Sequence, residues 1–143
     1  MDGEEITIKG QVKVDTVTRL DLFDGLFTTG YRLTSFEIAA QIPKSTNRMW
    51  AKLMTLEEPQ SDNWNWDNNA EIAWAIWNVN SHDIGTYNRV DEDMSIIEDL
   101  FLDVGGNTAT DFVNYIITMR KVTFPIGIGA MNMVRNQSQG PTT

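Results

Sequence analysis

The sequence has no cysteine and a single histidine, His82, among its 143 residues. Without cysteine the chain cannot form a disulfide, a thiolate zinc site, an iron–sulfur cluster or a thiol nucleophile. One histidine also excludes a multi-histidine metal centre within one chain. The chain is nevertheless long enough to bury a sizeable core without cross-links. We therefore expect one β-rich domain over residues 1–143, with no metal and no cofactor.

Basic charge and long apolar runs are also scarce. Eleven Lys and Arg residues oppose 20 Asp and Glu residues, which gives a formal net charge of −9. This balance disfavours direct binding to a nucleic-acid backbone. Lys9, Lys13 and Arg120–Lys121 alternate with apolar residues and could form a small basic stripe, which we interpret as solubilising charge. No stretch approaches the roughly 18 apolar residues of a membrane helix, and the acidic start is unlike a secretory signal.

Alternation of apolar and polar residues with a period of two is the dominant pattern in the chain, and it indicates half-buried strands. The predicted strands are residues 6–14, 31–42, 48–56, 71–79 and 113–124. Both faces of residues 71–79 are apolar, which predicts a strand covered on both sides. Gly10 interrupts the first strand and predicts a β-bulge. Long helices do not alternate with the strands, so we predict a mainly β, antiparallel sandwich or barrel.

One or two short helices are expected beside the strands. Ser95 and Glu98 have the spacing of a capping box, which favours a short helical turn or a loop within residues 95–104, followed by a strand. The alternation in the same segment leaves a hairpin with residues 113–124 as an alternative. Ile128, Met131 and Val134 are spaced for a short helix near the C-terminus.

Three further segments carry no regular pattern. Residues 19–29 are compatible with a tight hairpin or a helical turn. Residues 59–69 and 80–91 are predicted loops, and loops of that length are usually disordered or functional.

The loop at Ser61–Asn69 has the most unusual local composition. Trp64 and Trp66 alternate there with Asn65 and Asp67. Three interpretations stay open: the tryptophans fold back as a lid on the core, they anchor a protein interface, or they stack on a sugar while the amides and acids bond its hydroxyls.

Metal binding and catalysis receive little support from the sequence. Oxygen-bearing side chains alternate after Asn63, but in a calcium loop starting there the glycine position is Asn68 and the glutamate position is Trp74. The acidic residues between Asp91 and Asp103 are typical of a solvated face. His82 lies between Ser81 and Asp83, and sequence neighbours seldom converge into a triad. No G-x-S-x-G elbow is present either, so we predict that the protein is not an enzyme.

Seven methionines and five tryptophans are more than a small core needs. Both residue types favour contact surfaces. We therefore predict a structural subunit that packs with copies of itself or with other subunits into a protein shell, as a coat, capsid-like or accessory virion protein. Extended arms at residues 1–18 and 125–143 would reach neighbours. The contact candidates are Trp64, Asn65, Trp66, Asp67, Met131 and Met133. The alternative is a β module that binds carbohydrate or another ligand through the Trp64/Trp66 loop.

Overall fold

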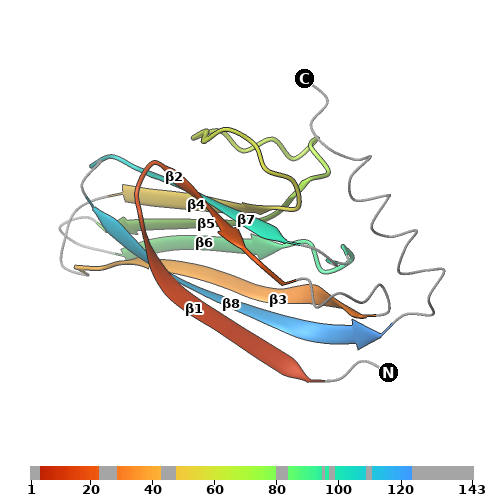
Figure 1. The fold of residues 1–143 in the computed structure, drawn as a ribbon. Helices are drawn as coiled ribbons and strands as arrows, with labels where there is room; N and C mark the ends of the chain where they lie inside the picture. Colours follow the sequence, from red (N-terminus) through yellow and green to blue (C-terminus); the bar gives the residue numbers. More distant parts are fainter. Residues whose placement is uncertain are drawn as a thin grey trace.

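A computed structural model gives the fold and describes residues 4–22, 29–42, 48–79, 84–94, 96, 99–108 and 111–123. Eight strands form in this part of the chain, and no helix does (Figure 1). The strands are β1 (Glu5–Lys13), β2 (Thr16–Leu20), β3 (Thr29–Ala40), β4 (Arg48–Met54), β5 (Glu71–Val79), β6 (Ile84–Val90), β7 (Leu100–Gly106) and β8 (Phe112–Thr123).

The strands form two sheets. The small sheet has the order β1-β8-β3, and the large sheet has the order β2-β7-β4-β5-β6. Every neighbouring pair is antiparallel. The prediction of a mainly β, antiparallel fold is thus confirmed.

Successive strands alternate between the sheets at the start of the chain. β1 and β3 lie in the small sheet, β2 and β4 lie in the large sheet, and β8 and β7 return between the members of each pair. The first crossing is a turn at Val14 and Asp15, where Asp15 has a φ of 63°; aspartate tolerates this left-handed region better than most residues. Val14 N donates to Asp111 O at 3.0 Å, and Asp15 N donates to Val104 O at 2.8 Å. Most of the predicted arm at residues 1–18 is therefore built into β1 and β2.

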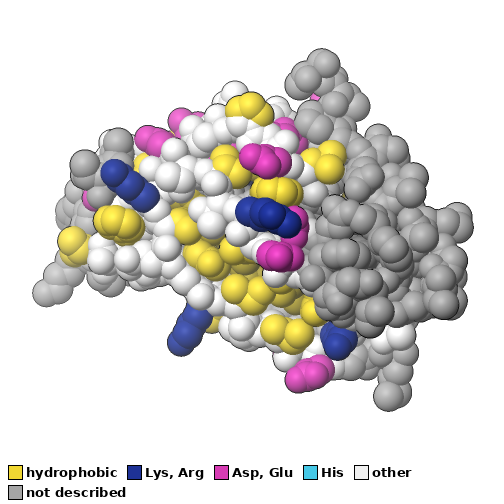
Figure 2. All heavy atoms as spheres, in the orientation of Figure 1, with side chains coloured by type: hydrophobic (Ala, Val, Ile, Leu, Met, Phe, Trp, Pro, Cys, Tyr) yellow, Lys and Arg dark blue, Asp and Glu magenta, His cyan; other side chains and the backbone are white. Residues whose placement is uncertain are grey.

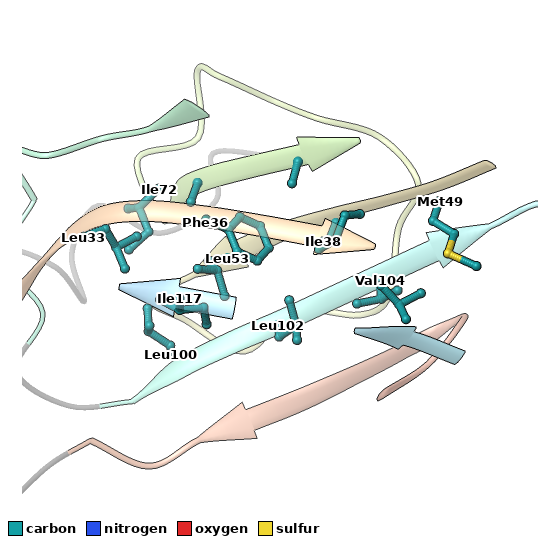
Figure 3. Packing of buried hydrophobic residues seen from close by; sticks show 14 of the residues in the cluster. Leu33, Phe36, Ile38, Met49, Leu53, Ile72, Leu100, Leu102, Val104 and Ile117 are labelled. Carbon is teal, nitrogen blue, oxygen red and sulfur yellow. The ribbon is translucent and has the colours of Figure 1, made fainter. Parts of the chain in front are cut away.

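The hydrophobic core lies between the two layers (Figure 3). A bulge between Leu33 and Ser35 lets Leu33, Phe36 and Ile38 of β3 all point toward the large sheet, and each is at most 6% exposed. Leu53 and Leu102 face them from the large sheet, and both are fully buried. Burial of one face of each strand is the main stabilising contribution to such a fold.

All five predicted strands are confirmed, but the expected bulge at Gly10 is wrong. The register between β1 and β8 runs through Gly10 and Tyr115 without a shift. A Cβ atom on Gly10 would lie 2.6 Å from Tyr115 Oη. The glycine is therefore needed because the tyrosine ring crosses the strand at this point.

The helical turn expected within residues 95–104 is wrong from Leu100 onward, where β7 begins, and Ser95, Ile97 and Glu98 lie outside the described residues. The alternative hairpin with residues 113–124 is wrong too, since β7 pairs with β2 and β4 and not with β8. Leu100, Leu102 and Val104 are all buried on one face of the strand. Burial at a period of two has overridden the helical spacing.

The predicted loop at residues 80–91 contains β6, so this prediction is wrong as well. β6 is an edge strand and its residues 85–89 are exposed. With no buried face it lacks the apolar alternation that reveals a strand. Residues 23–28, His82 and the predicted C-terminal helix, with Met131 and Met133, lie outside the described residues, as does the arm at residues 125–143.

Candidate functional site

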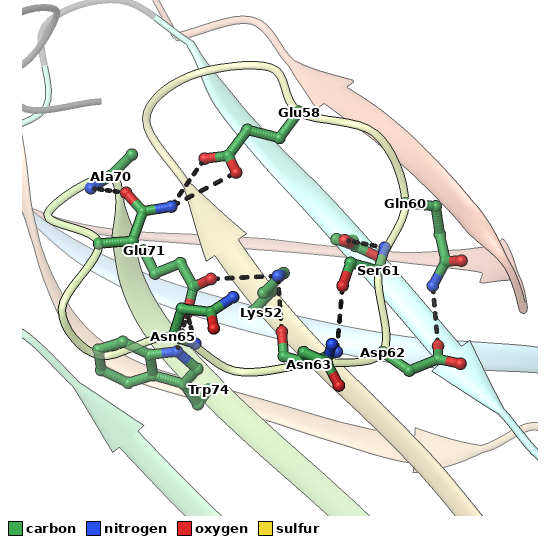
Figure 4. Close-up of polar contacts among 12 residues, drawn as sticks. Lys52, Glu58, Gln60, Ser61, Asp62, Asn63, Asn65, Ala70, Glu71 and Trp74 are labelled. Atoms are coloured by element: carbon green, nitrogen blue, oxygen red, sulfur yellow. Dashed lines mark hydrogen bonds and ion pairs between the residues drawn. The ribbon is translucent and has the colours of Figure 1, made fainter. Parts of the chain in front are cut away.

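Residues 55–70, which we name the covering loop, lie across the outer face of the large sheet and are held there by a buried ion pair (Figure 4). Lys52 on β4 and Glu71 on β5 are each 3% exposed. Lys52 Nζ lies 3.1 Å from Glu71 Oε2, and it also donates to Asn63 O at 2.8 Å. The lysine therefore ties the covering loop to both strands.

The second carboxylate oxygen of Glu71 accepts two further hydrogen bonds. Asn65 N donates to Oε1 at 2.8 Å, and Trp74 Nε1 donates to the same atom at 3.0 Å. A buried charge is tolerated when it is paired and its remaining lone pairs are bonded. This network therefore fixes the backbone of the covering loop just before Trp66.

A second set of contacts fixes the other end of the covering loop. Trp50 Nε1 donates to Asp62 Oδ1 at 3.0 Å, and Ser61 N donates to Asp103 Oδ2 at 3.1 Å. A Cβ atom on Gly105 of β7 would collide with the Trp50 indole and with Asp62 Oδ1. Glycine at this position therefore lets the indole lie against the strand.

Asp103 is the residue of this second set whose carboxylate is buried with one oxygen unpaired within the described part of the chain. Its side chain is 2% exposed, and Oδ1 has no hydrogen-bond partner within the described part of the chain. Burial raises the pKa of its carboxyl group above 3.8, while the bond from Ser61 and the charge of Lys52 oppose the rise. A buried carboxylate that is only half bonded costs free energy.

Beside the covering loop is a hollow of about 820 Å³, which we name the aromatic hollow. Its lining is Trp66, Trp74, Tyr87, Asn88, Arg89, Val90, Asp91, Glu92 and Asp93. Trp66 is 62% exposed, and its ring centre lies 5.5 Å from that of Trp74. Tyr87 is 44% exposed. The hollow thus combines open aromatic faces with charged side chains.

The register of the large sheet brings this set together. Trp74 pairs with Lys52 on one side and with Arg89 on the other. These positions face away from the core, because the neighbouring Leu53–Ala73 pair lies within it. Tyr87 is two residues before Arg89 and therefore shares its face.

The four predicted residues of the covering loop have different surroundings. Trp66 lines the aromatic hollow, whereas Trp64 is half-buried with its ring centre 6.1 Å from that of Tyr87. Asn65 acts through its backbone N–H, and Asp67 is exposed. The sequence interpretation missed Tyr87 and Arg89, because both lie on the strand that it assigned to a loop.

A second hollow, of about 780 Å³, opens between the two sheets. Its lining includes Ile38 on β3, Trp77 on β5 and Tyr115 on β8, together with Thr86 and Asn88 of β6. Figure 2 shows hydrophobic side chains gathered in the middle of this view, where β6 and β3 run side by side in Figure 1. Trp77 Nε1 has no hydrogen-bond partner among the described residues.

Within the described ranges, no group of three or more His, Cys, Asp or Glu side chains is arranged to hold a metal ion. None of those residues forms a helix long and apolar enough to cross a membrane. Comparison with protein-family models, with curated proteins and with solved structures finds no match to this chain.

Proposed function

We propose that this chain is a non-enzymatic structural subunit that assembles with copies of itself into a protein shell, using the aromatic hollow as a contact surface. The observation that carries the proposal is the exposure of Trp66 and Tyr87 next to Arg89. Tryptophan, tyrosine and arginine supply most of the binding energy in protein interfaces. In this proposal the assembled shell is that of a virion.

The fixed position of the covering loop supports the same proposal. Ordering a mobile loop on binding reduces affinity. Here Asn63 and Asn65 are already bonded to buried charged groups of β4 and β5. Trp66 follows directly, so its exposed ring is held in place before any partner arrives.

The path of the chain also supports a shell subunit. The first four strands alternate between two antiparallel sheets, and β7 and β8 return between earlier strands, which resembles the path of a jelly-roll sandwich. In a regular jelly roll β6 would pair with β3, whereas here it pairs with β5. Jelly rolls occur in viral capsid proteins and in lectins. A fold does not determine function, so the properties of the protein surface have to distinguish a capsid protein from a lectin.

The test compares the wild-type chain with Trp66→Ala by size-exclusion chromatography, light scattering and negative-stain electron microscopy. We expect the wild type to form particles of uniform size and Trp66→Ala to elute at the 16.2 kDa of one chain. Asn69→Ala is the control, because Asn69 is exposed on the same loop and does not line the hollow. Normal assembly of Trp66→Ala would contradict the proposal.

Carbohydrate binding is the second candidate, and a different property of the aromatic hollow favours it. Flat aromatic faces stack on sugar rings, and the hydroxyl groups of a sugar need both donors and acceptors. Arg89 and Asn88 offer donors, and Asp91 and Asp93 offer acceptors. If this candidate is right, the chain stays monomeric, and neutral oligosaccharides change its tryptophan fluorescence in the wild type but not in Trp66→Ala.

A further inference from the structure

We infer that the partner of the aromatic hollow is the outer face of the small sheet on a second copy of the chain. This inference rests on the proposed function and names the partner surface for that same site. We name this surface the bare face, because no described residue covers it. It consists of the outward-pointing side chains of β1, β8 and β3.

The register of the small sheet shows which side chains make up the bare face. Lys9, Ile116 and Glu37 form one row across the three strands. Lys13 and Phe112 form a second row, two residues along. Phe112 is 41% exposed and Ile116 is 37% exposed, so β8 presents an apolar centre with lysines beside it.

Charge distinguishes the bare face from the rest of the molecule. Its outward positions hold four basic residues and two acidic ones: Lys9, Lys13, Arg32, Arg120, Glu5 and Glu37. This excess of positive charge occurs in a chain whose net charge is −9. The aromatic hollow has the opposite balance, with three acidic residues against Arg89. Complementary charge favours docking and selects one register over others.

The two surfaces also lie on opposite sides of the molecule. The two sheets form separate layers (Figure 1). The register places Trp74 and Arg89 of the aromatic hollow on the outer side of the large sheet, and the bare face lies on the outer side of the small sheet. A contact between the aromatic hollow of one copy and the bare face of another is therefore heterologous. Each copy binds one neighbour through its hollow and a second neighbour through its bare face. Contacts of this kind build rings or open filaments. A subunit in which only one of the two surfaces can bind therefore cannot extend the assembly.

Two charge-reversed chains test this inference. The hollow variant carries Glu92→Lys and Asp93→Lys, and the face variant carries Lys9→Glu and Lys13→Glu. All four side chains are exposed, so we expect both variants to fold. Each variant alone is expected to stay at the mass of one chain. A mixture of the two is expected to assemble, because the intact hollow of one variant meets the intact bare face of the other, and the two reversed surfaces are complementary as well.

A chain with all four reversals is expected to assemble again, because its two surfaces are complementary once more. The control is Glu57→Lys, which is exposed and lies outside both surfaces, and it should assemble normally. Assembly of either two-site variant by itself, or no assembly in the mixture, would overturn the inference while the proposed function stands. A wild-type chain that stays monomeric at every concentration would instead contradict the proposed function.

Discussion

The outer faces of the two sheets differ in what lies on them. On the large sheet, the covering loop buries Lys52, Glu71 and Asp103 beneath it. On the small sheet, the outward side chains of β1 are exposed, and Phe112 and Ile116 are in contact with solvent. The same two-sheet fold thus has one face built around buried charge and one face with no described cover.

This difference shows that a polar loop can be held on a sheet by buried polar contacts instead of by apolar packing. A buried ion pair adds little net stability compared with apolar residues of the same size, but breaking it is costly. Its effect here is to give the covering loop one position, which fixes Trp66 at the rim of the aromatic hollow. The bare face has no such constraint, so its residues can be replaced with little effect on folding.

The largest expected effect of a substitution is on the buried ion pair. Glu71→Ala should lower the free energy of unfolding by about 3–5 kcal/mol, because Lys52 loses its counter-charge in a buried site. The N–H groups of Asn65 and Trp74 lose their acceptor as well. Lys9→Ala on the bare face should change the same quantity by less than about 0.5 kcal/mol. Chemical denaturation of both variants checks the contrast, and equal losses would show that the two faces do not differ.

A smaller effect is expected at Gly105, beneath the Trp50 indole. Gly105→Ala should cost about 1–3 kcal/mol, because the new methyl group displaces the indole and breaks its bond to Asp62. Gly85→Ala is the matched control, since the nearest atom to its Cβ would be Asn78 O at an ordinary 3.7 Å. Thermal unfolding and the fluorescence of Trp50 measure the effect. A Gly105→Ala chain as stable as Gly85→Ala would mean that the indole can move freely.

The smallest effect concerns Asp103, and it depends on pH. Burial raises the pKa of this carboxyl group in the folded chain above 3.8. Below 3.8 the group is protonated in both states and costs nothing, whereas above the raised folded value its ionised form destabilises the fold. Asp103→Asn should therefore stabilise the chain at neutral pH by an amount on the order of 1 kcal/mol. The gain should vanish in acid, and the same gain at every pH would contradict this assignment.

The sequence predicted β1, β3, β4, β5 and β8 and missed β2, β6 and β7. β1, β3 and β4 alternate, because one side of each faces the core, whereas β5 and β8 are rich in branched and aromatic residues. β6 has no buried face, and β7 has alternation mixed with helical spacing. Whether either segment forms a strand depends on the strands that pair with it in the sheet, and tertiary contacts determine that pairing.

The candidate site could be predicted only in part. The composition of residues 61–69 pointed to Trp66, because tryptophan in a polar loop is unusual. Tyr87 and Arg89 join it through the pairing of β5 with β6, and Lys52 and Glu71 meet through the pairing of β4 with β5. Register of this kind depends on the whole sheet, so no local pattern reveals it.

The most direct test of the account is the mass of the wild-type chain in solution. Light scattering over a range of protein concentrations, at low and high salt, measures it without any substitution. We predict a mass that rises well above 16.2 kDa with concentration and falls back as salt is added. A mass of 16.2 kDa at every concentration and in both salts would contradict it.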